Sequence, residues 1–194
     1  MTAAPLRLAL VVVIGLIAAA DPASAQLDRF FGRYVGDGRL HDLVTGEVEE
    51  RDLLTSIEPF GEGGFAVRWS SVVRIDGARD VPGVRHLVRA LAFEPAGDGD
   101  YYLRAPDYDP FRLRERLEPM AGDALAWATV EGDTLDIYVF AVTGAGAGEL
   151  QRHRRVRTAT GMNLAYTGLV DGVVVTNGSG RMVRVGDPVR LDGR

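Results

Sequence analysis

Apolar and polar residues alternate along much of the chain with the two-residue period of β-strands. The clearest alternation lies in residues 65–75, where one face carries Phe65, Val67, Trp69, Ser71 and Val73. No amphipathic helix of ordinary length appears after residue 26. The pattern therefore predicts an all-β protein.

Short β-type segments recur every 10–15 residues, with Gly, Asp or Pro between them. The predicted strands are residues 30–35, 48–58, 65–75, 85–94, 101–104, 124–130, 134–142, 149–160 and 162–169. Residues 173–176 and 182–185 are expected to form a C-terminal hairpin about the turn Asn177-Gly178-Ser179-Gly180. Residues 109–120 read either as a short helix or as a loop or edge strand, and we favour the second reading.

Strands at this spacing are typical of a β-sandwich or an up-and-down barrel. Closure of the sheet would remove the exposed edges that a long meander otherwise presents. We therefore predict an antiparallel up-and-down β-barrel of about eight strands with an extra C-terminal hairpin.

Residues 1–25 have the layout of a secretory signal peptide. Arg7 precedes an apolar run at residues 8–20, and the small-residue site Ala23-Ser24-Ala25 follows. The run is shorter than the ~20 residues that a membrane-spanning helix needs. An uncleaved N-terminal anchor is the alternative. We expect cleavage after Ala25, a single domain at residues 26–194 with no transmembrane segment, and a periplasmic or secreted location.

Two residue types are missing from the composition. The chain has no Cys and no Lys, so all 22 basic residues are Arg, and the net charge is −5. These absences exclude disulfides, thiolate metal sites, thiol nucleophiles and Schiff-base chemistry. The negative net charge also disfavours nucleic-acid binding.

The segment Phe31-Gly32-Arg33-Tyr34 resembles the first-strand motif of the calycin superfamily, the lipocalins and their relatives. In that family a Gly-x-Trp opens the first strand, and an Arg near the end of the last barrel strand crosses over the Trp. Here Tyr34 stands in place of the Trp, and Arg155 and Arg157 are candidates for the crossing Arg. The resemblance implies a closed-end pair of Tyr34 and Arg155, with a small hydrophobic ligand in the open end of the barrel.

The run Arg152–Arg157 holds four arginines within six residues. In a strand, His153, Arg155 and Arg157 would share one face, and Arg152, Arg154 and Val156 the other. Arginines inside a barrel would require carboxylate partners or an anionic ligand, such as a fatty acid or a phosphate. The alternative is that one face is solvated while the other closes over Tyr34.

Aromatic residues on three different strands are candidates for the lining of a ligand cavity. They are Trp69, Trp127 and Tyr138, and ordinary core packing is their alternative role. The three histidines lack metal-site spacing, and no serine lies in a G-x-S-x-G motif. We therefore predict no catalytic residue, no metal and no cofactor.

These observations favour an exported, soluble β-barrel that binds a small ligand, either apolar or anionic and amphipathic. One alternative is a filled barrel with a structural role, docked to a protein partner in the cell envelope. Another is an isomerase or hydrolase on a barrel scaffold, in which a polar cluster containing His153 or His86 opens to a pocket.

Overall fold

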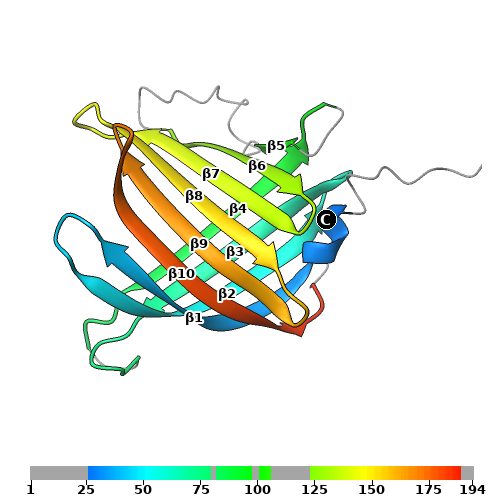
Figure 1. The fold of residues 1–194 in the computed structure, drawn as a ribbon. Coiled ribbons are helices and arrows are strands. Elements are labelled where there is room, and N and C mark those ends of the chain that lie inside the picture. The colour runs from blue at the N-terminus through cyan, green and yellow to red at the C-terminus, as the bar shows by residue number, and fades with distance from the viewer. Residues whose placement is uncertain (1–25, 80–81, 98–100, 106–122, 189–194) are drawn as a thin grey trace, which may run out of the picture.

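The chain folds into a closed antiparallel β-barrel (Figure 1). The computed structural model describes residues 26–79, 82–97, 101–105 and 123–188. Within them a short 3-10 helix, η1 (Asp28–Phe30), precedes ten strands. The strands are β1 (Gly32–Asp42), β2 (Val48–Phe60), β3 (Gly64–Val73), β4 (His86–Pro95), β5 (Tyr101–Arg104), β6 (Leu125–Glu131), β7 (Thr134–Val142), β8 (Gly148–Arg157), β9 (Gly161–Val170) and β10 (Val173–Gly186). Each strand pairs with its neighbour in sequence, and β10 returns to pair with β1.

The prediction of an antiparallel up-and-down barrel is confirmed, but the barrel has ten strands, and the predicted C-terminal hairpin is wrong. Residues 173–186 form one continuous strand, β10, in which Gly178 and Gly180 lie in extended ladder positions. The chain turns earlier, at Asp171 and Gly172, which have φ of 49° and 81°. The first strand likewise continues through Gly36 and Gly38 to Asp42, whereas the predicted strand ended at residue 35.

Glycines on β1 and β10 serve close packing between the strands rather than turning. A Cβ on Gly38 would lie 2.8 Å from the Ser179 carbonyl oxygen and 2.9 Å from Leu53 Cδ1. A Cβ on Gly180 would meet the Asp37 carbonyl oxygen at 2.8 Å. Contacts this short leave no room for a side chain, so these positions require glycine for the barrel to close.

One end of the barrel is filled by a hydrophobic core that η1 covers (Figure 1). Leu27 and Phe30 are buried there, and the Tyr34 hydroxyl donates a hydrogen bond of 2.8 Å to the Phe30 carbonyl oxygen. Phe65 stacks on Phe93 at a centroid distance of 4.8 Å within the same core. This packing makes the η1 end of the barrel the closed end.

Two predicted features fall on residues 1–25 and 109–120, and they lie outside the described part of the chain. Among the described residues, no helix has the length and apolar character needed to cross a bilayer.

Candidate functional site

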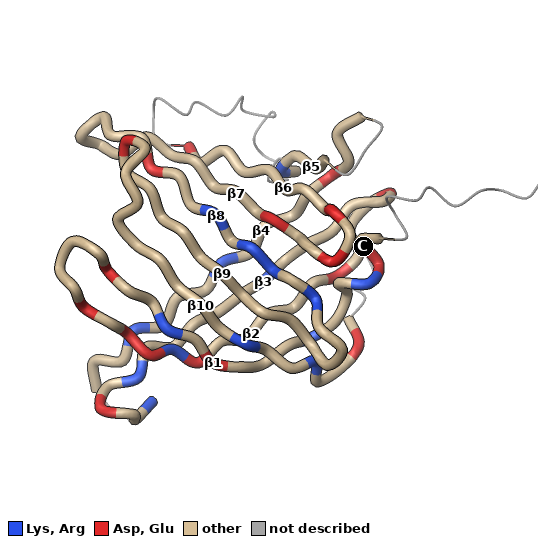
Figure 2. The backbone as a smooth tube through the Cα atoms, viewed as in Figure 1, with Lys and Arg blue, Asp and Glu red and all other residues tan. Residues whose placement is uncertain are grey.

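Arginines follow one another along β8 (Figure 2), and the alternation of a strand divides their side chains between the two faces of the barrel. On the outer face, Arg152 and Arg154 both lie 2.9 Å from the Asp136 carboxylate of β7. Burial alone would raise the pKa of Asp136, but hydrogen bonds from Arg154 and Arg152 outweigh it, and the pKa lies below its ordinary value. The outer arginines of β8 are therefore neutralised within the chain.

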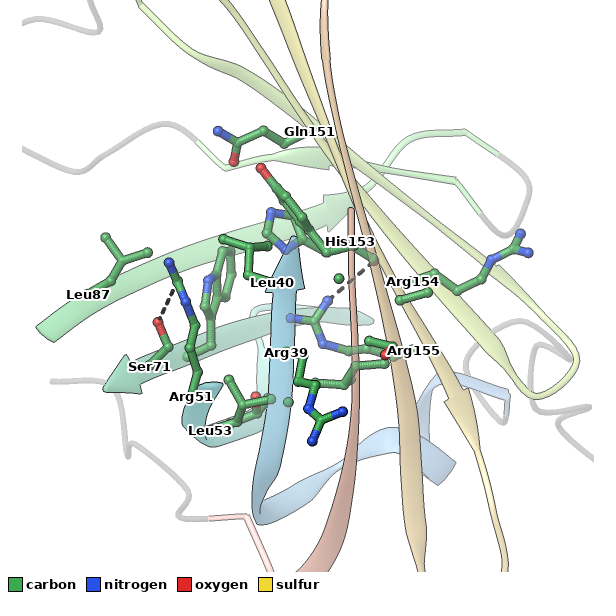
Figure 3. Close-up of a pocket in the computed structure, with 18 of the residues that line it drawn as sticks. Arg39, Leu40, Arg51, Leu53, Ser71, Leu87, Gln151, His153, Arg154 and Arg155 are labelled. Atoms are coloured by element: carbon green, nitrogen blue, oxygen red, sulfur yellow. Dashed lines mark hydrogen bonds between the residues drawn. The ribbon is translucent and has the colours of Figure 1, made fainter. Parts of the chain in front are cut away.

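The inner face of β8 borders a pocket of about 300 Å³ inside the barrel (Figure 3). Its lining mixes apolar, aromatic and cationic side chains, including Leu53, Trp69, Arg89, His153, Arg155 and Tyr166. A cavity of about 150 Å³ is large enough to bind benzene. The pocket therefore has room for a small molecule of roughly twice that size.

Arg155 is the most deeply buried cation of the pocket. Its side chain is 3% exposed, and its Nε has no hydrogen-bond partner among the described residues. Its Nη1 donates a long hydrogen bond of 3.4 Å to the His153 carbonyl oxygen, and the guanidinium lies 5.4 Å from the centre of the Trp69 ring. Burial lowers the pKa of Arg155 to about 10, so the side chain is still charged at neutral pH. The described chain therefore places an unpaired cation inside the barrel.

Side chains from opposite walls meet across the interior of the barrel. β3 and β8 are five strands apart in the ring of ten, yet the rings of Trp69 and His153 lie 5.2 Å apart. His153 also contacts the Tyr166 ring at 5.0 Å, and Arg89 of β4 donates a 3.1 Å hydrogen bond to the Gln151 amide oxygen. The residues that line the pocket accordingly come from β1–β4 and β8–β10, and none of its described lining residues lies on β5, β6 or β7.

His153 is half-buried, its Nε2 is covered, and it is neutral within this cluster. Burial, followed by the positive charges of Arg155 and Arg89, lowers the pKa of His153 to about 3. Its Nε2 has no hydrogen-bond partner in the part of the chain that the structure describes. The site therefore holds a second buried polar atom that could bind a ligand group.

The other charged groups in and around the pocket are largely satisfied within the chain, including Arg39, which pairs with Glu50. Arg51 pairs with Glu49, which also binds Arg85, and Arg51 Nη1 lies 3.3 Å from Ser71 Oγ. Glu149 accepts a 2.6 Å hydrogen bond from the Gln151 amide. The positive charge of the pocket therefore belongs chiefly to Arg89 and Arg155.

The structure separates the residues that the sequence placed in one site. Trp69 and Arg155 border the pocket, whereas Tyr34 lies in the closed-end core. The predicted pair of Tyr34 and Arg155 is not formed: the Tyr34 hydroxyl bonds to the Phe30 carbonyl oxygen, and the Arg155 guanidinium lies against Trp69. Arg184 and Arg157 are the cations that act on the Tyr34 hydroxyl. Arg157 lies at the closed end, 6.0 Å from the centre of the Phe30 ring and 3.0 Å from Asp133.

The expectation that Trp127 and Tyr138 line the cavity is wrong. Their rings stack on each other at 5.2 Å on the outer face, where Arg152 lies 5.7 Å from the centre of the Tyr138 ring. The inner face of β6 instead carries small side chains such as Ala126 and Ala128, both buried. The large aromatic residues of the same core come instead from β3, β4 and β5, namely Phe65, Phe93 and Tyr102.

Sequence reasoning missed three groups of the pocket, Arg51, Arg89 and Tyr166. Arg89 alternates with Leu87 and Leu91 along β4, which is a signal for an inward arginine. His153, which the enzyme hypothesis had named, also lies in the pocket, whereas His86 is exposed at the start of β4. No group of three potential metal ligands gathers among the described residues.

Comparisons with known proteins give little information about this site. No family model and no curated protein matches the sequence. Among solved structures, an S-type phycobiliprotein lyase, CPES from Guillardia theta, matches with 14% sequence identity and a TM-score of 0.46. The alignment covers 82% of this chain and 90% of that chain. The function of the pocket must therefore be inferred from its own residues.

Proposed function

We propose that this barrel binds a small anionic, amphipathic ligand in the pocket, with the acid group of the ligand on Arg155. The apolar part of the ligand would lie against Leu53, Leu164 and the edge of Trp69, all of which border the pocket. The calycin resemblance of residues 31–34 supports this proposal, because that family holds its ligands inside the barrel. Residues 1–25 have the layout of a secretory signal peptide, so we also propose that the protein is exported and carries its ligand outside the cytoplasm.

The observation that carries the proposal is the unpaired guanidinium of Arg155. Removing an ion from water carries a penalty of several kcal/mol unless an opposite charge and hydrogen bonds replace the water. The neighbouring arginines Arg152 and Arg154 have such a partner in Asp136, but Arg155 faces the pocket on the other side of the strand. An anionic ligand would supply the missing charge and hydrogen-bond acceptors.

The test compares decanoate with decanol, two probes with the same chain length that differ in charge. The sequence has two tryptophans, Trp69 and Trp127. In the variant Trp127→Phe only Trp69 remains, so the tryptophan fluorescence reports on the pocket. We expect decanoate to bind about ten-fold more tightly than decanol or better, since a hydrogen bond to a charged group contributes about 1.5–3 kcal/mol. Calorimetry with the unmodified protein gives an independent measure of affinity.

Two arginine variants assign the effect to the pocket. Arg155→Met should remove the preference for decanoate, whereas Arg68→Met, on the exposed face of β3 in the opposite wall, should keep it. Both substitutions remove one positive charge, so a difference between them cannot come from net charge. Wild-type protein that binds neither probe, or Arg155→Met protein that still prefers decanoate, would contradict the proposal.

A further inference from the structure

Two guanidiniums that face the pocket, not one, lack an acidic partner among the described residues. Arg155 has only its long bond to the His153 carbonyl and its contact with Trp69. Arg89 binds the neutral amide of Gln151 and is half-buried. The binding of a single acid group to Arg155 would therefore leave Arg89 unneutralised.

The two cations reach β8 at different depths. Gln151, His153 and Arg155 occupy successive inward positions of that strand, and their register partners on β7 are Val139, Ile137 and Leu135. Alternate residues of a strand are about 6.7 Å apart, so the backbone at Gln151, where Arg89 binds, lies roughly 13 Å from that at Arg155. The Arg155 guanidinium bends back toward His153, which shortens the distance between the charges.

His153 occupies the position between them, with its unpartnered Nε2. The histidine is neutral, so it does not compete with Arg155 or Arg89 for the acid groups of a ligand. The described residues that line the pocket include no acid. Glu49 and Glu149 lie further along β2 and β8, where Glu49 pairs with Arg51 and Glu149 accepts a hydrogen bond from the neutral Gln151 amide. The layout along the inner face of β8 is thus a cation, a neutral polar group and a second cation, with Arg89 reaching this face from β4.

We infer that the ligand carries two acid groups, one bound by Arg155 at the deep end of the pocket and one bound by Arg89 nearer the opening. This inference rests on the proposed function and makes it more specific. The apolar part between the acids would be about the size of two fused aromatic rings, since the volume is about twice that of a cavity that binds benzene. A polar substituent on it could hydrogen-bond to His153.

The experiment compares naphthalene-2,6-dicarboxylate with 2-naphthoate, which share one ring system and differ by one carboxylate. Dissociation constants are measured by calorimetry with the full barrel at neutral pH and low ionic strength. We expect the dicarboxylate to bind about ten-fold more tightly or better. In Arg89→Met the ratio of the two constants should fall to about one, while in Arg68→Met it should stay at the wild-type value.

A ratio of two affinities within one variant does not depend on how stable that variant is. Arg89→Gln serves as a second variant, because it removes the charge and keeps an amide that can bind Gln151. Equal affinities for the two probes in the wild type, or an unchanged ratio in both Arg89 variants, would overturn the two-acid inference and leave the proposed function standing. Binding of neither probe would instead overturn both.

Discussion

Arg155→Met should make the ligand-free protein more stable, although it removes a buried residue from the interior. A pKa of about 10 in place of 12.5 corresponds to roughly 3 kcal/mol by which burial disfavours the charged side chain. Against this stands the contact with Trp69 at 5.4 Å, which contributes at most about 2 kcal/mol. Methionine also fills irregular apolar space well. We therefore expect the free energy of unfolding to rise by about 1–2 kcal/mol.

The assay is urea unfolding followed by circular dichroism, with ligand removed beforehand. A higher midpoint at an unchanged slope reports a gain in stability. Decanoate should then stabilise the wild type more than the variant at the same concentration, because the stabilisation grows with the affinity of the ligand for the folded state. Arg155→Met would thus raise the stability of the ligand-free protein while it weakens the binding of decanoate.

The neighbouring residue Arg154 provides a control, because its substitution should lower the free energy of unfolding rather than raise it. Arg154→Met takes one of two arginines away from Asp136, which is 5% exposed, and should lower stability by about 1 kcal/mol, since Arg154 itself is partly exposed. A loss of more than about 1 kcal/mol in Arg155→Met would refute the reasoning. It would mean that the chain already compensates the Arg155 charge.

Three further predictions test other parts of the structure. Between pH 6.5 and about 3, His153 should lower the free energy of unfolding by up to about 1.4 kcal/mol for each unit of acidification, because the unfolded side chain takes up a proton that the buried one refuses. Urea titrations should show that His153→Phe flattens this dependence, and an equally steep loss in the variant would contradict it. Gly38→Ala should destabilise by about 1–3 kcal/mol through its clash with the β10 backbone, while Gly144→Ala, with open space around it, should leave the melting temperature almost unchanged. Phe30→Ala at the closed end should cost about 3–5 kcal/mol in the same melts, and a loss below 1 kcal/mol would argue against tight packing of η1 on the core.

Local alternation predicted most of the strands because one face of each is buried. The bounds predicted for β5 and β7 agree with the structure, and the face of β3 that carries Phe65, Val67 and Trp69 is the buried one. The glycines of β1 and β10 misled the prediction, because a glycine required by a neighbouring strand looks the same in sequence as one required by a turn. Only the pairing of two distant segments distinguishes the two cases.

The site was predictable in part, for a similar reason. Alternation separated Arg155 from Arg154, and it could not say which of the two faced inward. On β6, the small Ala128 faces the interior and Trp127 faces outward, against the usual preference for buried aromatics. The room available at any interior position depends on side chains from the opposite wall, and a single strand carries no information about them.

The pairing of β1 with β10 also constrains how this protein reaches its folded state. Arg33 pairs with Gly186, so the last seam of the barrel joins segments from nearly opposite ends of the described chain. Contacts of such long sequence separation form slowly, because the entropy of closing the intervening loop is lost before the contact contributes. Until β10 is in place, the growing sheet has two open edges and an unenclosed pocket, and it is prone to pair with other chains. Ligand binding should therefore be among the last properties to appear during refolding.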